Sequence, residues 1–338
     1  MVISLSLSFV GLSAVIIVAA MFLAKFADEI ANRTGLGGSV TGLVLLAGAT
    51  SLPELSVGYS AVRFAAAPDL TAGGVLGSSL VNLLILALVD LISRRPGRIL
   101  TRTASAHALS ATVGALLTGL ILLGILVDNP LTFFRVSPAN WAVIAAYTLC
   151  ARLIFLDQRE SAKHDAGEIA ANKAQDESKP TFLATVMSVV GFLVSTVVIF
   201  VVAPPLAEKA DLLAIETGLG RTFIGTLLVA AVTSLPEAVS TISAVRLGAV
   251  DMAIANIFGS NAFNMVIFAT LDFATESSLL YVVSETHAIT AACVLITTAV
   301  GLLSILYRAE KRLWLVEPDA ALIALLVVGS LYLVYITG

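Results

Sequence analysis

The stretch Gly-Ala-Thr-Ser-Leu-Pro-Glu at residues 48–54 decides how this chain is interpreted, because most of it occurs twice. Thr-Ser-Leu-Pro-Glu fills residues 50–54 and again residues 233–237. Each copy lies within an apolar run of about 20 residues or more, the length that crosses a bilayer. A carboxylate in the middle of such a run costs at least about 2.5 kcal/mol to insert, so a repeated one indicates a functional site.

The repetition extends well beyond these five residues. Further segments match when the sequence is shifted by 182 or 183 residues, and these pairs are 34–37 with 217–220, 61–63 with 244–246, 77–78 with 259–260, and Asn82 with Asn264. The matches keep their order and spacing in both halves, so the chain contains an internal duplication.

The composition is that of an integral membrane protein. Hydrophobic residues make up 58% of the 338 residues and charged residues only 12%, half of the roughly 25% usual in soluble domains. Lipid offers no partner to backbone polar groups, so each of the ten apolar runs is predicted to be a helix. The predicted helices occupy residues 5–24, 40–66, 70–92, 104–127, 137–156, 181–206, 223–247, 250–274, 285–307 and 315–336.

The number of helices in each half determines the expected architecture. Five spans per half require the second half to be inserted upside down relative to the first. We therefore expect an all-α integral membrane protein with ten transmembrane helices, arranged as two inverted five-helix repeats over residues 1–156 and 181–338. In transporters built this way, substrate sites lie near the bilayer midplane at interrupted helices.

Positive charges give the expected orientation in the membrane. With the N-terminus outside, the inner loops hold 15 of the 19 Lys and Arg residues, and the outer loops hold Arg63, Arg135, Lys209 and Arg221. This excess favours a multi-pass cell-membrane protein with both termini outside. Residues 157–180 contain six acids and four bases, so we expect them to form a hydrophilic cytoplasmic linker without a core of its own.

Several classes of function are excluded or disfavoured. A formal net charge of −4 and the absence of a basic cluster interleaved with aromatic residues argue against a nucleic-acid partner. Cys150 and Cys293 both lie in apolar runs, which predicts buried thiols rather than a disulfide framework or a zinc site. No catalytic Ser/His pair or zinc-protease motif is visible, so we do not expect an enzyme. A channel remains an alternative, and it would conduct without a counter-ion.

Polar residues share one helical face within each duplicated segment. Spacings of i, i+3, i+4 and i+7 bring two hydroxyls and a carboxylate onto one stripe, and i, i+4 pairs of Ser and Asn follow in the next helix. The candidate site residues are Ala47, Thr50, Ser51, Glu54, Ser78 and Asn82 in the first half, and Ala230, Thr233, Ser234, Glu237, Ser260 and Asn264 in the second.

The chemistry of these residues favours a hard cation. Pro53 and Pro236 each remove a backbone donor inside the helix, so local unwinding is expected to free the carbonyl oxygens of Ala49 and Val232. Carboxylates, hydroxyls, amides and carbonyls are then available, as calcium needs with its six to eight oxygen ligands. Soft transition metals would require Cys, His or Met on the stripe. We expect a transported cation and no resident cofactor.

The paired segments at 48–54 and 232–237, with Gly-Ser-Ser at 77–79 and Gly-Ser-Asn-Ala-Phe-Asn at 259–264, resemble the two alpha repeats of the cation/calcium exchanger superfamily, most closely its sodium/calcium exchanger branch. The resemblance implies a site built from the second, third, seventh and eighth helices, with gating by the first and sixth.

The resemblance also implies roles for the candidate residues. Glu54 and Glu237 would bind calcium in competition with sodium, while Ala47 and Ala230 would offer main-chain carbonyls. The Thr and Ser residues would supply hydroxyl ligands, and the cluster would be completed by Asn82 and Asn264.

Two drivers of transport stay open from the sequence. The leading hypothesis is a secondary antiporter that exchanges calcium for sodium by alternating access through one shared site. The alternative keeps the fold but couples calcium, or another divalent cation, to protons, with Glu54 and Glu237 alternately protonated and bound to the cation. In both hypotheses the partners are inorganic cations and the lipid bilayer.

Overall fold

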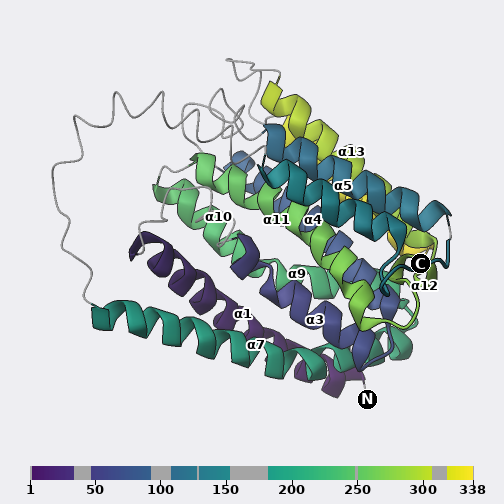
Figure 1. Ribbon diagram of the computed structural model, residues 1–338, viewed down its shortest axis with the longest axis horizontal. Helices are drawn as coiled ribbons and strands as arrows, with labels where there is room; N and C mark the ends of the chain where they lie inside the picture. The colour runs from purple at the N-terminus through teal and green to yellow at the C-terminus, as the bar shows by residue number, and fades with distance from the viewer. Residues whose placement is uncertain are drawn as a thin grey trace.

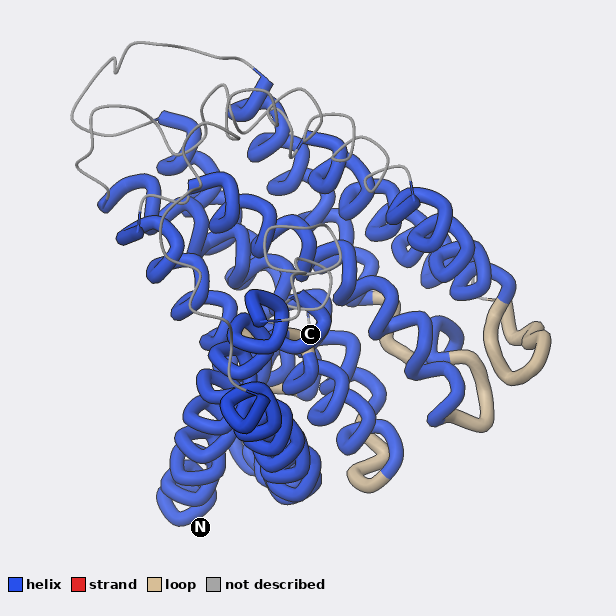
Figure 2. The backbone as a smooth tube through the Cα atoms, turned by 60° about the vertical axis from the view of Figure 1, so that its left-hand side comes forward, coloured by secondary structure: helices blue, strands red, loops and turns tan. Residues whose placement is uncertain are grey.

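A computed structural model of the protein describes residues 2–33, 47–92, 108–127, 129–152, 182–247, 250–306 and 318–337. Nearly all of these residues are helical, and in the view of Figure 1 the long helices lie side by side. Figure 2 shows the same all-helical arrangement from a second side, with the helix that carries the N-terminus at one edge. Helices that are apolar on every side, as most of these are, suit surroundings of lipid and other helices.

Seven helices in the described part of the chain are long and apolar enough to cross a membrane, and the number is eight if a bent helix pair is counted as one broken span. The seven are α1 (Val2–Arg33), α4 (Pro68–Ile92), α5 (Ala108–Val127), α7 (Phe182–Thr217), α11 (Val250–Thr270) with its 3-10 extension η3 (Leu271–Ala274), α13 (Thr286–Leu306) and α14 (Pro318–Thr337). The chain is therefore a multi-pass membrane protein.

The bent pair is interrupted more than once. It consists of α8 (Arg221–Ile224), the π-helical segment η2 (Gly225–Val229), α9 (Ala230–Thr233) and α10 (Leu235–Leu247). A short helix, α12 (Leu279–Val282), precedes α13. Segments of π-helix are rare and are frequently found at functional sites.

The two remaining predicted helices are helical over most of the residues that the structure describes, except Ser51, residues 64–66 and Ser137. Residues 47–50 and α3 (Leu52–Arg63) cover part of the prediction 40–66, and residues 138–152 cover most of 137–156. The predicted stretches 40–46, 104–107 and 153–156, as well as the linker 157–180, lie outside the described residues.

Two predicted helices were too short. The prediction ends the first helix at residue 24, before Lys25, and the sixth at residue 206, after Pro204 and Pro205. In the structure, α1 extends to Arg33 and has 32 residues, and α7 extends to Thr217 and has 36. The long helices pack against each other along the edge of the bundle (Figure 1). Helix α7 also packs against α3, and buried alanines of α7, among them Ala207 and Ala210, lie in one apolar cluster with Val57 and Ala61 of α3. This packing compensates for the hydrogen-bond donor that each proline removes, so α7 continues past Pro204 and Pro205.

Helix α4 passes unusually close to the interrupted span. A Cβ atom added at Gly77 would lie 2.5 Å from the carbonyl oxygen of Thr226, and one added at Gly225 would lie 2.6 Å from that of Leu70. Only glycine fits at such distances, as in other membrane helices whose backbones touch. The close approach brings the middle of α4 next to α9.

We expect Gly77→Ala to lower the free energy of unfolding by about 1–3 kcal/mol, because the added methyl group would press the two backbones apart. The thermal midpoint in detergent measures the effect. Gly119→Ala is the matched control, since nothing lies within 4 Å of a Cβ at that position. If both variants melt at the wild-type temperature, the close packing of α4 on η2 is refuted.

Candidate cation site

Both duplicated helices break at the serine of the repeated motif. Ser51 separates residues 47–50 from α3 with φ −88° and ψ 6°, and Ser234 separates α9 from α10 with φ −84° and ψ 0°. The second break bends the span by 45°. The prolines two residues later have no N–H to donate to the carbonyl four residues earlier, so the helix deviates at this point. The prediction that both helices are interrupted near the prolines is confirmed. The interruption is a single non-helical residue in each helix, not the unwound turn that was expected.

The two glutamates follow these breaks directly. Glu54 and Glu237 lie in the first turns of α3 and α10, where the helix dipole favours a negative charge. Their exposed fractions are 3% and 0%. Neither carboxylate forms an ion pair with any residue that the structure describes. Two uncompensated carboxylates are thus enclosed within the bundle.

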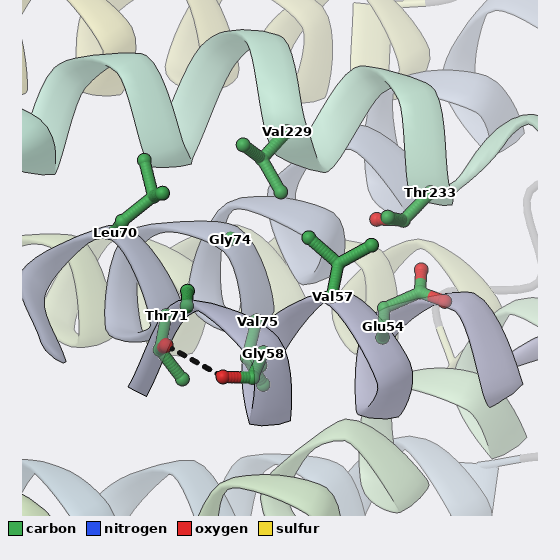
Figure 3. A pocket seen from close by; sticks show the side chains of 10 residues that line it. Glu54, Val57, Gly58, Leu70, Thr71, Gly74, Val75, Val229 and Thr233 are labelled. Carbon is green, nitrogen blue, oxygen red and sulfur yellow. Dashed lines mark hydrogen bonds between the residues drawn. The ribbon is translucent and has the colours of Figure 1, made fainter. Parts of the chain in front are cut away.

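Each carboxylate is approached by hydroxyls from both halves of the chain. Oε1 of Glu237 accepts hydrogen bonds from Ser51 and Ser260, at 3.4 Å each. Glu54 faces the hydroxyls of Thr233 and Ser78, whose oxygens lie 3.1 Å apart. In Figure 3, the carboxylate of Glu54 on α3 points toward Thr233 on α9. The two repeats therefore contribute to one shared site.

Main-chain carbonyls border the same site. The hydroxyl of Thr50, which also approaches Glu237, donates to the carbonyl oxygen of Ala47 at 3.1 Å. The equivalent hydroxyl of Thr233 donates to the carbonyl oxygen of Ala230 at 3.5 Å. Both carbonyls also accept the backbone N–H four residues ahead. The carbonyl oxygens predicted as site atoms thus lie beside the hydroxyls, although each already accepts two donors.

The asparagines are arranged differently from the expected symmetric pair. Asn82 donates to the side-chain oxygen of Asn261 at 3.0 Å, and Asn261 donates to the carbonyl oxygen of Ser79 at 3.2 Å. Asn264 is fully buried, and its side chain has no hydrogen-bond partner among the described residues. Asn261, which links α4 to α11, was not predicted. Asn261 corresponds to Ser79 in the first repeat, and this difference between the two repeats is the feature of the sequence that could have indicated its role.

Several buried oxygens in this cluster have no hydrogen-bond partner among the described residues. Most buried polar atoms in proteins have one, so a local concentration of exceptions needs an explanation. The oxygens concerned are Oε1 and Oε2 of Glu54, Oε2 of Glu237, Oγ of Ser234, Oδ1 of Asn82 and Oδ1 of Asn264. A cluster rich in unpartnered oxygens, all but one of them carboxylate or amide oxygens that can only accept, is suited to a cation.

A family model described as sodium/calcium exchanger protein matches residues 4–153 and 187–337. The chain belongs to this family. The two matched segments correspond closely to the two predicted repeats, and they leave out the whole stretch 157–180 predicted as a linker. The family is one of exchangers rather than of enzymes.

Curated relatives cover most of the chain at modest identity. Inner membrane protein YrbG of Escherichia coli (strain K12) is 26% identical over 244 residues, which are 72% of this chain and 71% of YrbG. CaxA of Alkalimonas amylolytica is 27% identical over 244 residues, or 71% of each chain.

Solved structures share the fold. The crystal structure of the H+/Ca2+ exchanger CAX has a TM-score of 0.70 at 14% identity, covering 98% of this chain and 85% of its own. A structure of the sodium-calcium exchanger NCX_Mj has a TM-score of 0.59 at 17% identity, covering 98% of this chain and 99% of its own. At these identities the likeness concerns the fold alone.

The bridge between Asn82 and Asn261 is testable by a double-mutant cycle. We expect Asn82→Ala and Asn261→Ala each to destabilise the protein. Because the two side chains contact each other, the loss of unfolding free energy in the double variant should be smaller than the sum of the losses in the two single variants, by at least about 0.5 kcal/mol. Unfolding in detergent measures all four proteins. Strict additivity would show that the two amides do not interact.

Proposed function

We propose that the protein is a secondary antiporter that exchanges calcium for sodium by alternating access, through one cation site shared by both ions. The observation that carries this proposal is the pair of buried carboxylates, Glu54 and Glu237, held in one site by hydroxyls of both repeats without an ion-pair partner in the described chain. Membership of the sodium/calcium exchanger family supports cation exchange.

The ligands in this proposal are oxygens only. Glu54 and Glu237 neutralise one divalent ion, and the remaining oxygens complete the six to eight that calcium takes. These remaining ligands are the hydroxyls of Thr50, Ser51, Ser78, Thr233, Ser234 and Ser260, the amide oxygens of Asn82 and Asn264, and the carbonyl oxygens of Ala47 and Ala230. Sodium, also a hard cation, would use a subset of the same oxygens.

The proposal includes ten transmembrane helices in two inverted repeats. The helical residues 47–50, 52–63 and 138–152 occupy the positions of the two spans that are incompletely described. Both chain ends lie at the same end of the bundle in Figure 1, as an even number of spans requires. The distribution of Lys and Arg supports a cell-membrane protein with both termini outside and the linker 157–180 in the cytoplasm.

Proton coupling is the second candidate. Enclosed carboxylates whose oxygens have no partner in the described chain are also suited to exchanging a proton for a cation. The site would then alternate between calcium and protons on Glu54 and Glu237. The same residues serve in both candidates, so the driving ion has to be measured.

Removing either charge should abolish exchange. We expect Glu54→Gln and Glu237→Gln to transport calcium at less than one-tenth of the wild-type rate in proteoliposomes. Loss of partners outside the ligand shell already weakens metal sites by about 10–100-fold, and the loss of a ligand charge should have at least this effect. Glu216→Gln, at an exposed position, is the matched control and should transport normally. Near-normal calcium flux in either site variant would contradict the proposal.

The driving ion can be identified with calcium-loaded vesicles of the wild-type protein. We expect an inward sodium gradient to drive calcium release at constant pH, and an inward proton gradient without sodium to drive little. The rate of release, followed with a calcium-sensitive dye, measures both conditions. Release driven by the proton gradient alone would replace sodium coupling by proton coupling.

A further inference from the structure

The two carboxylates have different neighbours, although the helices that carry them are duplicated. One turn after Glu54 lies Gly58, and the matching residue after Glu237 is Thr241. On the adjacent helices, Gly74 of α4 matches Asn256 of α11. Two glycines in the first repeat thus replace two polar side chains in the second.

The polar side chains fill their space in the second repeat. Asn256 donates one hydrogen bond to the hydroxyl of Thr241 at 3.2 Å and another to the carbonyl oxygen of Glu237 at 3.4 Å. These bonds attach α10 to α11 beside the glutamate. The carboxylate of Glu237 itself is oriented by Ser51 and Ser260. Protein groups therefore hold the backbone of Glu237 and its Oε1, whereas its Oε2 has no hydrogen-bond partner among the described residues.

A small cavity occupies the corresponding space in the first repeat (Figure 3). Its volume is about 10 Å³, close to the minimum of about 10–15 Å³ that holds one water molecule. The cavity is lined by Glu54, Val57, Gly58, Ala61, Leu70, Thr71, Gly74, Val75, Val229 and Thr233. Among these, the polar side chains belong to Glu54, Thr71 and Thr233.

The polar lining meets the needs of a water molecule. Both oxygens of Glu54 are buried without a hydrogen-bond partner in the described chain, so they are free to accept. The hydroxyl of Thr71 donates to the carbonyl oxygen of Gly58 at 2.9 Å and still has lone pairs to accept. Buried waters typically have two to four such partners. A calcium ion would need six to eight oxygens, which this largely apolar cavity lacks.

We propose that this cavity binds one water molecule, which donates a hydrogen bond to the carboxylate of Glu54 and fixes its orientation toward the cation. The function of this water rests on the proposed cation site, whereas its presence does not. The two carboxylates then differ in one neighbour. Glu237 accepts hydrogen bonds from hydroxyls of the protein, whereas Glu54, which faces the hydroxyls of Ser78 and Thr233, also accepts one from a bound water.

The bound water can be detected by hydroxyl-radical footprinting with synchrotron X-rays, because radicals formed from an enclosed water react with the side chains around it. We expect oxidation at Val57 and Val75, which are each 1% exposed. The fully buried Ile254 and Ile257 of the second repeat are the internal controls and should stay unoxidised. Absence of oxidation at Val57 and Val75 would overturn the proposal.

Variants separate the water from packing effects. Gly74→Ala places a methyl group in the cavity, 3.2 Å from a methyl of Val229, and Thr71→Val removes a polar partner at constant size. Both should abolish the oxidation at Val57 and raise the calcium concentration for half-maximal transport by about 10–100-fold, the usual effect of losing an outer partner. Thr71→Ser should restore both, and Gly119→Ala should change neither.

The outcomes distinguish this proposal from the proposed function. Unchanged oxidation in Gly74→Ala and Thr71→Val, or none in the wild type, refutes the water site even where Glu54→Gln abolishes exchange. Oxidation that follows the expected pattern while Glu54→Gln transports normally supports the water site and refutes the cation site. An unchanged calcium requirement in variants that have lost the oxidation refutes the orienting role.

Discussion

The electrostatic cost of two carboxylates inside a membrane bundle is the constraint on which the rest of this structure depends. A single charged side chain at the bilayer centre costs at least about 2.5 kcal/mol, and usually a buried charge is paired. Here Glu54 and Glu237 have no ion-pair partner in the described chain, and hydroxyls and unpartnered oxygens surround them. Under the proposed function, the transported cation is the missing partner, so the empty site is the less stable state and binding compensates the buried charge.

The backbone is shaped to meet this constraint. Breaks at Ser51 and Ser234 place each glutamate in the first turn of a new helix, where the helix dipole favours its charge. Glycines at the crossing of α4 and η2 let the two backbones touch, which brings Ser78 within 3.1 Å of Thr233. Hydroxyls from both repeats approach each carboxylate. A movement of one repeat relative to the other would therefore change the surroundings of both glutamates together, as alternating access requires.

Much of this architecture could be predicted from the sequence because the chain is duplicated and because lipid restricts the backbone to helices. The interrupted helices, the mid-span glutamates and their hydroxyl neighbours all followed from spacing. Helix ends were less predictable: α7 continues past Pro204 and Pro205 because tertiary packing stabilises it. Spacing along one helix could not predict the link through Asn261, because it joins two helices that are far apart in sequence. Nor could it predict the cavity beside Glu54, which arises where glycines take the place of larger side chains.

The most direct test of the central claim is a cryo-electron microscopy or crystal structure of the protein with bound calcium. The account predicts one calcium ion between the two carboxylates, about 2.3–2.6 Å from at least one oxygen of Glu54 and one of Glu237. Density for calcium at any other place, with these two carboxylates left uncoordinated at saturating calcium, would contradict it.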